Sequence, residues 1–335
     1  RKSLMLFDKS GIHNILVISL TNIGDVILTL PVVDILKNDF PAAQLSVVVG
    51  PKAASLLEDN PHLRKVYIFD KQQSVYQTIL WIRELRRQHF DLVIDLRHTA
   101  IPFFISAKYK TPVILANRGD AHMRDKHLLR LRSVYLYDAV PAASGVLFVS
   151  DENQRYVRGL VQERLDENQR YVVVAPGAAD HAKRWAGKYF TEVCYHLIKK
   201  YYVKVVLVGD ESDRRIAQRI VEMLGEGTLN LCGQTNLIQL TEVLRHALLV
   251  IANDSAPMHL ASYLDVPVLA LFGPTDALKY GPWSSNSRYL RQNQFCPACQ
   301  NPQSSSRHTC MEAITTSAVM EAFQVVNDQV IFPKP

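Results

Sequence analysis

The chain has 335 residues, of which 48% are hydrophobic and 21% are charged, and its formal net charge is +6. This length allows two ordinary domains, each with its own core, and the composition is that of a soluble globular protein. The charge suits an anionic ligand or an anionic membrane surface, but it is too small to indicate nucleic acid. The longest apolar runs, such as residues 266–272, have the length of a strand and cannot cross a bilayer. We therefore expect a cytoplasmic protein that touches a membrane, if at all, from its surface.

Residues 1–150 alternate short apolar segments with helical patterns, and we expect them to form the first domain. The predicted strands cover residues 14–20, 44–49, 65–69, 90–96 and 112–115, and the predicted helices cover residues 25–38 and 74–88. Nearly continuous apolar strands separated by helices indicate a parallel sheet that is covered on both faces.

Residues 170–312 repeat the same plan as a second domain, after a charged, helix-prone linker at residues 151–169. The predicted strands cover residues 171–175, 204–208, 229–232, 248–252 and 266–272, and the predicted helices cover residues 188–200, 212–224, 237–246 and 256–264. One more helix is expected at residues 315–328, within a C-terminal segment at 313–335. The alternation indicates a doubly wound α/β fold.

The first predicted strand leads into the loop SLTNIGD, which ends at Asp25. Ligands bind open parallel sheets at the carboxyl ends of the strands, so residues in such loops are candidates for a site. Asp25 has two interpretations. It is either a carboxylate favoured at a helix start by the macrodipole, or a general base facing an interdomain cleft, with Thr21 and Gly24 shaping its pocket.

The loop PGAADHAKRW follows the first strand of the second domain. Gly177 allows close backbone approach, and Lys183 and Arg184 precede a helix, so backbone amides and a cation would hold a diphosphate there. The alternative is a solvated cation pair beside a buried Trp185. The loop has neither GxxxxGK[ST] nor GxGxxG, and an NAD-linked dehydrogenase is disfavoured because the glycine fingerprint is also missing after the first strand.

The segment NDSAPMH leaves a later strand of the second domain and starts a helix. Asp254 or Ser255 is expected to be the N-cap, and a cap at this edge also faces a ligand. His259 lies one turn further on and is either a ligand contact or a core histidine. Three further residues belong to turns or helix starts that would also reach a ligand: Glu211, Gly273 and Pro274.

Together these motifs resemble glycosyltransferase family 9, the heptosyltransferase family. The matching segments are IGDVILTLPVVDILK, FDLVIDLRHT, APGAADHAKRWAGKYF, VVLVGDESD, NDSAPMHLASYLDVPVLALFGPTD and CPAC…HTCMEAI. The resemblance preserves the order of the motifs over nearly the whole chain. It implies the GT-B architecture: two Rossmann-like, doubly wound parallel-sheet domains that face a cleft, with the C-terminal helix packing back toward the N-terminal domain.

The resemblance also implies roles for residues. Asp25 matches the catalytic base, Lys183 the lysine that contacts the donor phosphates, and Asp254 and His259 the donor motif. The full donor-binding prediction is Gly177, Lys183, Arg184, Glu211, Asp254, Ser255, His259, Gly273 and Pro274. The acceptor-binding prediction is Thr21, Gly24 and Arg97, in the N-terminal domain.

The implied reaction is inverting transfer of a sugar, with heptose from ADP-heptose as the leading donor and a lipopolysaccharide-core glycolipid as the acceptor. No cofactor is required, and no Asp-x-Asp motif calls for a catalytic metal. Ala178, Ala179 and the sequence at 253–256 depart from other members, which leaves another nucleotide sugar as an alternative. A sugar-nucleotide epimerase and a non-catalytic nucleotide- or glycan-binding protein are further alternatives, and the presence of Asp25 favours an enzyme.

A basic region covers residues 108–132. It would meet a phosphorylated glycolipid or the headgroups of the inner membrane's cytoplasmic face, or else form a solvated loop and helix face. Its cations are Lys108, Lys110, Arg118, Arg124, Lys126, Arg130 and Arg132.

A second cluster lies near the C-terminus, where Cys296, Cys299, His308 and Cys310 have the residue types of a tetrahedral zinc site. Its second pair is tightly spaced, and the sequence favours no metal. Neither the basic region nor this cluster is needed for the implied chemistry.

Overall fold

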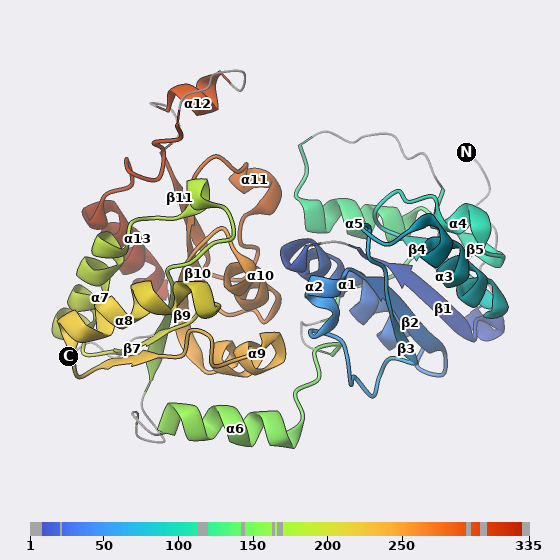
Figure 1. The fold of residues 1–335 in the computed structure, drawn as a ribbon, viewed down its shortest axis with the longest axis horizontal. Coiled ribbons are helices and arrows are strands. Elements are labelled where there is room, and N and C mark those ends of the chain that lie inside the picture. Colours follow the sequence, from blue (N-terminus) through green and yellow to red (C-terminus); the bar gives the residue numbers. More distant parts are fainter. Residues whose placement is uncertain are drawn as a thin grey trace. The chain divides into compact units, whose positions relative to one another are not determined.

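Two separate parallel sheets organise the chain, one in the unit Arg1–Phe148 and one in the unit Val149–Pro335 (Figure 1). The computed structural model describes residues 9–20, 22–112, 120–141, 145–162, 165, 170–292, 296–301 and 307–329. The prediction of two doubly wound α/β sheets is confirmed. The division between the units falls before Val149, close to the predicted domain end at residue 150.

The first unit has five parallel strands in the order β3-β2-β1-β4-β5. The strands are β1 (Asn14–Ile18), β2 (Gln44–Val49), β3 (Lys65–Ile68), β4 (Phe90–Asp95) and β5 (Ala107–Lys110). The helices are η1 (Lys9–Gly11), α1 (Ile23–Asp39), α2 (Pro51–Ala54), α3 (Val75–Arg87), α4 (Ile101–Phe104) and α5 (Met123–Arg132).

Helix α1 is the buried helix of this unit, packed against α5 and next to β2. Every residue from Val26 to Leu36 is buried, including Pro31 in the helix interior. A helix that is apolar all round is stable only when other elements cover it on every side. No helix in the described part of the chain is long and apolar enough to cross a bilayer.

The second unit has six parallel strands in the order β11-β10-β9-β6-β7-β8. The strands are β6 (Tyr171–Ala175), β7 (Lys204–Leu207), β8 (Thr228–Asn230), β9 (Ala247–Asn253), β10 (Val268–Phe272) and β11 (Arg288–Arg291). The helices are α6 (Asp151–Gln162), η2 (His181–Lys183), α7 (Gly187–Tyr201), η3 (Glu211–Asp213), α8 (Arg214–Leu224), α9 (Leu237–Arg245), α10 (Ala256–Tyr263), α11 (Ala277–Tyr280), α12 (Pro297–Gln300) and α13 (Thr316–Gln329).

The central strands of this sheet are buried on both faces. Residues at every second position, such as Val172 and Val174, pack into one core with α7, α8 and α13. The intervening residue Val173 is also fully buried. This double burial is why the strands appear in the sequence as continuous apolar runs rather than as an alternation of apolar and polar residues.

Two helices at the ends of the second unit bear on the predicted domain organisation. Residues 151–162 of the predicted linker form α6, which packs against α9. The last helix, α13, packs against α7, β10 and β11, and Phe323 lies edge-on to Tyr201 at 4.7 Å between ring centroids. Its expected packing toward the first unit stays a prediction.

The sequence analysis missed two edge strands, one in each sheet. The first is β5 (Ala107–Lys110); of the strand expected at residues 112–115, Pro112 lies in no strand and residues 113–115 are outside the described residues. The second is β11, at an edge of the second unit's sheet. Both have charged residues in short sequences, AKYK and RYLR, because edge strands are partly solvated and lack the apolar run that marks a central strand.

Candidate active site

Each sheet has one point where the strand order reverses, between β1 and β4 in the first unit and between β6 and β9 in the second. Ligands of doubly wound sheets bind beside this point, at the carboxyl ends of the strands. Four predicted residues follow these four strands: Asp25 follows β1, Arg97 follows β4, Lys183 follows β6 and Asp254 follows β9. The topology therefore brings them together in two pairs.

In the first unit, Asp25 lies in the first turn of α1 and forms an ion pair with Arg97. The guanidinium Nη1 is 3.3 Å from the Asp25 Oδ1, and the two side chains are 25% and 18% exposed. The backbone is strained in both loops, since Leu20 and His98 have φ of 30° and 52°. Gly24 lies beside Asp25 in α1, and Thr21 is outside the described residues.

Two buried charged residues fix the loop after β4: Asp95, which the sequence analysis did not single out, and Arg130, which it placed in the basic region. The Asp95 carboxylate accepts hydrogen bonds from the Arg97 amide at 2.9 Å and the Thr99 amide at 2.6 Å. Arg130 donates to the carbonyl of Asp95, and its Nη1 is 3.0 Å from Nδ1 of His98. Arg130 is only 3% exposed, so its place in a solvated or headgroup-binding surface is corrected: this cation is used inside the fold.

His127, from α5, lies among these cations. Its side chain is buried, and Nε2 has no hydrogen-bond partner among the described residues. Burial, followed by the charges of Arg97 and Arg130, lowers the pKa of His127 to about 3. The imidazole is therefore neutral at physiological pH, and the surroundings of Asp25 disfavour additional positive charge.

In the second unit, Lys183 and Asp254 form the equivalent pair, with 2.8 Å between Nζ and Oδ2. His259 approaches the other carboxylate oxygen, with Nε2 at 3.6 Å, and its buried Nδ1 has no partner among the described residues. The ring of Trp283 is 6.2 Å from that of His259. Burial by itself would raise the pKa of Asp254, but His259 and Lys183 outweigh burial and lower it to about 2.

Asn253 connects the loops of this second pair and was also missed as a site residue. Its side chain is fully buried. Oδ1 accepts from the Trp185 amide at 3.2 Å, and Nδ2 donates to the carbonyls of Pro176 at 2.9 Å and Gly177 at 3.3 Å. One amide side chain thus fixes the start and the end of the loop that carries Lys183.

Gly177 is required by a buried carboxylate. A Cβ at this position would lie 2.0 Å from Oδ2 of Asp213, so no other residue fits without movement. Burial and the nearby Asp210 raise the pKa of Asp213. Arg184 has a structural contact in the same loop, because its Nε donates to the carbonyl of Ala178 at 2.5 Å.

The loop after β10 packs against the turn of Lys183. A Cβ at Gly273 would lie 2.8 Å from the carbonyl oxygen of Ala182 and 3.0 Å from the Met311 side chain. Pro274, the next residue, is partly buried.

Two further donor predictions, Ser255 and Glu211, lie at helix starts, as expected from the sequence, and their donor role stays a prediction. Ser255 is the N-cap residue of α10, but its hydroxyl donates to the Asn253 carbonyl at 3.1 Å and no side chain caps the helix. Glu211 is the exposed first residue of η3, in the loop after β7, and pairs with Arg214 at 3.3 Å.

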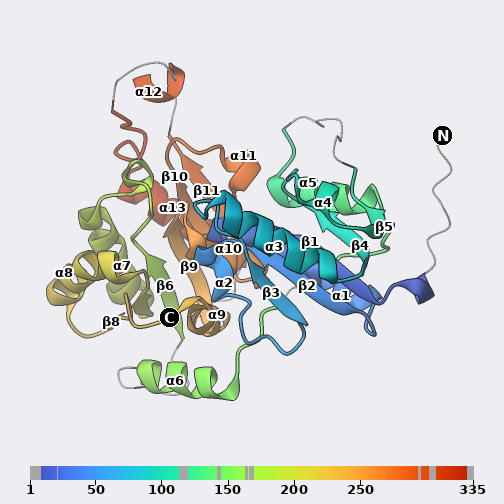
Figure 2. The same ribbon diagram turned by 45° about the vertical axis from the view of Figure 1, so that its right-hand side comes forward.

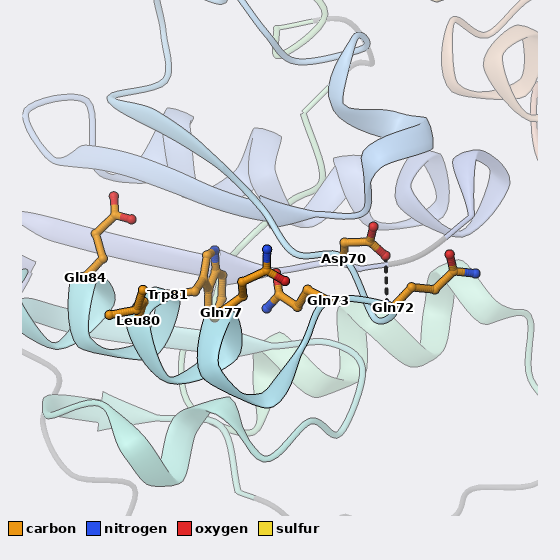
Figure 3. A pocket seen from close by; sticks show the side chains of 7 residues that line it. All are labelled: Asp70, Gln72, Gln73, Gln77, Leu80, Trp81 and Glu84. Carbon is orange, nitrogen blue, oxygen red and sulfur yellow. Dashed lines mark hydrogen bonds between the residues drawn. The ribbon is translucent and has the colours of Figure 1, made fainter.

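A cavity of about 660 Å³ lies elsewhere in the first unit, between α3 and the loop before it (Figure 3). Trp81 faces it and packs edge-on against Phe69, with 4.9 Å between ring centroids. None of the predicted site residues lines this cavity. Its lining residues are Asp70, Gln72, Gln73, Gln77, Leu80, Trp81 and Glu84.

Near the C-terminus, the structure gathers four side chains that we call the cysteine–histidine cluster: Cys296, Cys299, His308 and Cys310. Their ligand atoms all lie within 4.8 Å of one another.

Two Rossmann-like parallel-sheet units, each with a charged pair at its strand-order reversal, are typical of enzymes with the GT-B fold. The family model described as "Glycosyltransferase family 9 (heptosyltransferase)" matches residues 80–309. The chain belongs to this family, as its motifs predicted, and it is a transferase.

Comparisons with individual proteins agree with this assignment. The chain is 27% identical over 292 residues to lipopolysaccharide heptosyltransferase 3 of Escherichia coli (strain K12), covering 78% of this chain and 83% of that protein. The structure of a family 9 glycosyl transferase from Veillonella parvula DSM 2008 has a TM-score of 0.79 at 22% identity, covering 95% of this chain and 97% of that one. The structure of E. coli ADP-heptose lps heptosyltransferase II has a TM-score of 0.72 at 21% identity, covering 94% and 99%. The two structures support the fold.

Proposed function

We propose that this enzyme transfers heptose from ADP-heptose to a lipopolysaccharide-core glycolipid with inversion at the anomeric carbon. The observation that carries the proposal is the charged pair at each strand-order reversal, Asp25 with Arg97 and Lys183 with Asp254. The names of the relatives support the choice of heptose, ADP and lipopolysaccharide.

The donor binds the second unit in this proposal. Lys183 is part exposed, whereas its partner Asp254 is buried, so the ammonium can turn toward an incoming diphosphate while Asp254 stays in place. The uncapped start of α10 adds backbone amides for the phosphates. His259 supports this arrangement, since its Nε2 lies 3.6 Å from Oδ1 of Asp254.

The acceptor binds the first unit. Its hydroxyl oxygen forms the new bond to the anomeric carbon, its proton passes to the Asp25 carboxylate, and the bond to the diphosphate breaks with the electron pair leaving on ADP. Lys183 stabilises the charge that develops on this leaving group. Because a diphosphate leaves readily, no second carboxylic acid is needed. Arg97 orients Asp25 and attracts anionic groups of the acceptor, and Thr21 and Gly24 border the same loop.

The glycolipid acceptor implies peripheral membrane contact, which we assign to an exposed face of α3 and α4. The exposed apolar residues of this face are Val75, Tyr76, Ile79, Leu80, Phe103 and Phe104. Arg83 and Arg87 lie on the same side of α3 as Tyr76 and Leu80, at helical spacing. Apolar residues next to arginines are typical of surfaces that bind anionic headgroups.

Sedimentation with vesicles tests this face. Wild type should sediment with vesicles containing phosphatidylglycerol and remain in solution with pure phosphatidylcholine, and Ile79→Glu/Leu80→Glu should reduce the bound fraction severalfold. Met223→Glu, at an exposed apolar site in the second unit, is the matched control. Equal sedimentation of all three proteins would rule out the α3 face.

Calorimetric titration with ADP, UDP, GDP and CDP tests the donor. We expect a preference for ADP and at least about tenfold weaker binding for Lys183→Ala, since one charge-assisted contact is lost. Lys188→Ala, an exposed lysine in α7, is the control. Preference for another nucleotide would leave the assignment as a glycosyltransferase intact and exclude ADP-heptose as the donor. Absence of binding to all four nucleotides would exclude a donor site in the second unit.

A further inference from the structure

The cysteine–histidine cluster is formed by two short segments. Cys296 is the N-cap of the single-turn helix α12, and the amide of Cys299 donates to its carbonyl at 3.0 Å. Residues three apart on a helical turn present their side chains on the same side. His308 and Cys310 lie two positions apart in a stretch without helix. Their spacing is tight for the second ligand pair of a zinc site, but both side chains still reach the thiols of Cys296 and Cys299.

The distances within the cluster match a tetrahedral zinc site. Zinc binds sulfur at about 2.3 Å and nitrogen at about 2.0–2.1 Å, which separates two sulfurs by about 3.8 Å and a sulfur from a nitrogen by about 3.6 Å. Here Sγ of Cys299 is 3.8 Å from Sγ of Cys310 and 3.4 Å from Nδ1 of His308. Sγ of Cys296 is 3.8 Å from the same Nδ1.

The described surroundings of the cluster form only a small apolar core. Figures 1 and 2 show α12 at the outer end of the second unit, away from its sheet. Among the described residues, the local core contains Cys296, Ala298 and Cys310 as its buried members, with Cys299 packed against them. Such a small apolar cluster contributes little burial, and small units of this kind are commonly held by a metal. The Thr309 amide donates to Sγ of Cys296 at 3.3 Å, a contact that stabilises a thiolate ligand.

We propose that the cysteine–histidine cluster binds one zinc ion in a tetrahedral site with three thiolates and Nδ1 of the histidine as ligands. All four positions are filled by protein groups, so the ion has a structural role and no open position for substrate. The remaining two cysteines, Cys194 and Cys232, are buried elsewhere and take no part.

The zinc ion would anchor a segment that supports the donor loops. Cys310 is followed by Met311, whose side chain lies against Gly273, and by Ile314, whose carbonyl accepts from Nε1 of Trp185 at 2.9 Å. Both residues belong to the main core of the second unit. Fixing Cys310 therefore fixes the residues beneath the turn of Lys183.

Metal analysis of the intact protein tests the site. Protein purified without chelator should contain about one zinc per chain, and Cys299→Ser/Cys310→Ser should contain less than about 0.1, because binding of a structural zinc requires the full ligand set. Cys232→Ser is the matched control and should keep its zinc. Cobalt substituted into wild type should give the intense visible absorption of a tetrahedral thiolate complex.

A second variant separates ligand loss from misfolding. His308→Cys preserves four ligands and should retain about one zinc per chain, whereas His308→Ala should lose it. Chelation should lower the Tm of wild type on the order of 5 °C and leave Cys299→Ser/Cys310→Ser unchanged. Metal-free wild type, iron in place of zinc, or equal zinc in Cys299→Ser/Cys310→Ser would each overturn the proposal.

Discussion

Two aspartates occupy the same kind of position in the two units, after a central strand and beside the strand-order reversal, yet their surroundings differ. Asp25 is partly exposed, and its partner Arg97 is 3.3 Å away. Asp254 is buried between Lys183 and His259, which hold its pKa at about 2. The proposed base must be able to reach a substrate proton, and of these two aspartates only Asp25 is exposed enough to do so. In the proposed reaction the buried Asp254 instead positions Lys183, the cation assigned to the donor phosphates.

The largest expected effect is on turnover. Asp25→Asn should lower kcat by about 10²–10⁴-fold, the usual contribution of a general base, while ADP affinity stays unchanged. Asp39→Asn, at the other end of α1, is the control and should keep wild-type turnover. Initial rates at saturating donor and acceptor measure both variants. If Asp25→Asn turns over within tenfold of wild type, the assignment of the exposed aspartate as base is wrong.

The second-largest expected effect is on the pH dependence of the free energy of unfolding, to which His127 of the first unit and Asp254 of the second contribute in different pH ranges. The folded pKa of His127, about 3, is below its ordinary value of 6.5, so its stabilising contribution is present above pH 6.5 and is lost as pH falls toward 3. Between pH 6.5 and 4 this loss is about 3 kcal/mol. Urea unfolding over this range should show a smaller decline for His127→Leu, and an unchanged decline in Asp254→Asn. If the free energy of unfolding fell equally with pH in wild type and in His127→Leu, His127 would not be a buried neutral imidazole.

Asp254 should act in a lower pH window. Its folded pKa of about 2 lies below the ordinary 3.8, so the stabilisation is complete above about pH 4 and is lost as pH falls through 2. The shift corresponds to about 2 kcal/mol, so Asp254→Asn should be less stable than wild type by at least that amount at pH 7. The difference should shrink by about 1 kcal/mol between pH 5 and 3. A difference that is constant over this interval would show that the ion pair contributes no proton linkage.

The smallest effect concerns the glycine of the donor loop. Gly177→Ala places a Cβ against the buried Asp213, so the loop shifts and ADP binding should weaken about tenfold. Gly177→Ala/Asp213→Ala should recover much of that affinity because the obstructing carboxylate is removed. Calorimetry of both variants measures the coupling. If the losses of ADP affinity from the two substitutions simply add in the double variant, steric overlap with Asp213 is not the reason why Gly177→Ala binds ADP more weakly.

The central strands could be predicted because each one corresponds to a continuous apolar segment of the sequence. The apolar runs at β6 and β2 matched the observed strands, since strands buried on both faces exclude polar residues. The edge strands β5 and β11 could not be predicted in this way, because partly solvated strands lack a continuous apolar run. The positions of Asp25, Lys183 and Asp254 at carboxyl ends of strands followed from the same alternation.

Contacts between distant parts of the chain were beyond sequence patterns. Asn253 binds the Trp185 amide 68 positions away, and its burial was not visible in the motif NDSAP. Arg130 had the sequence context of a surface cation, but it reaches the carbonyl of Asp95 from α5. Nothing in the sequence marked Asp213 as a neighbour of the site, apart from the glycine at position 177 that leaves room for its carboxylate.

The three tryptophans of the chain are distributed so that fluorescence can report on each unit separately. Trp185 is buried in the loop that carries Lys183, and Trp283 lies beside His259, so both report on the second unit. Trp81 borders the cavity at α3 and reports on the first. In Trp81→Phe, the remaining emission should therefore follow nucleotide binding at the proposed donor site without any added dye. In a variant that keeps Trp81 alone, the emission should follow events at α3.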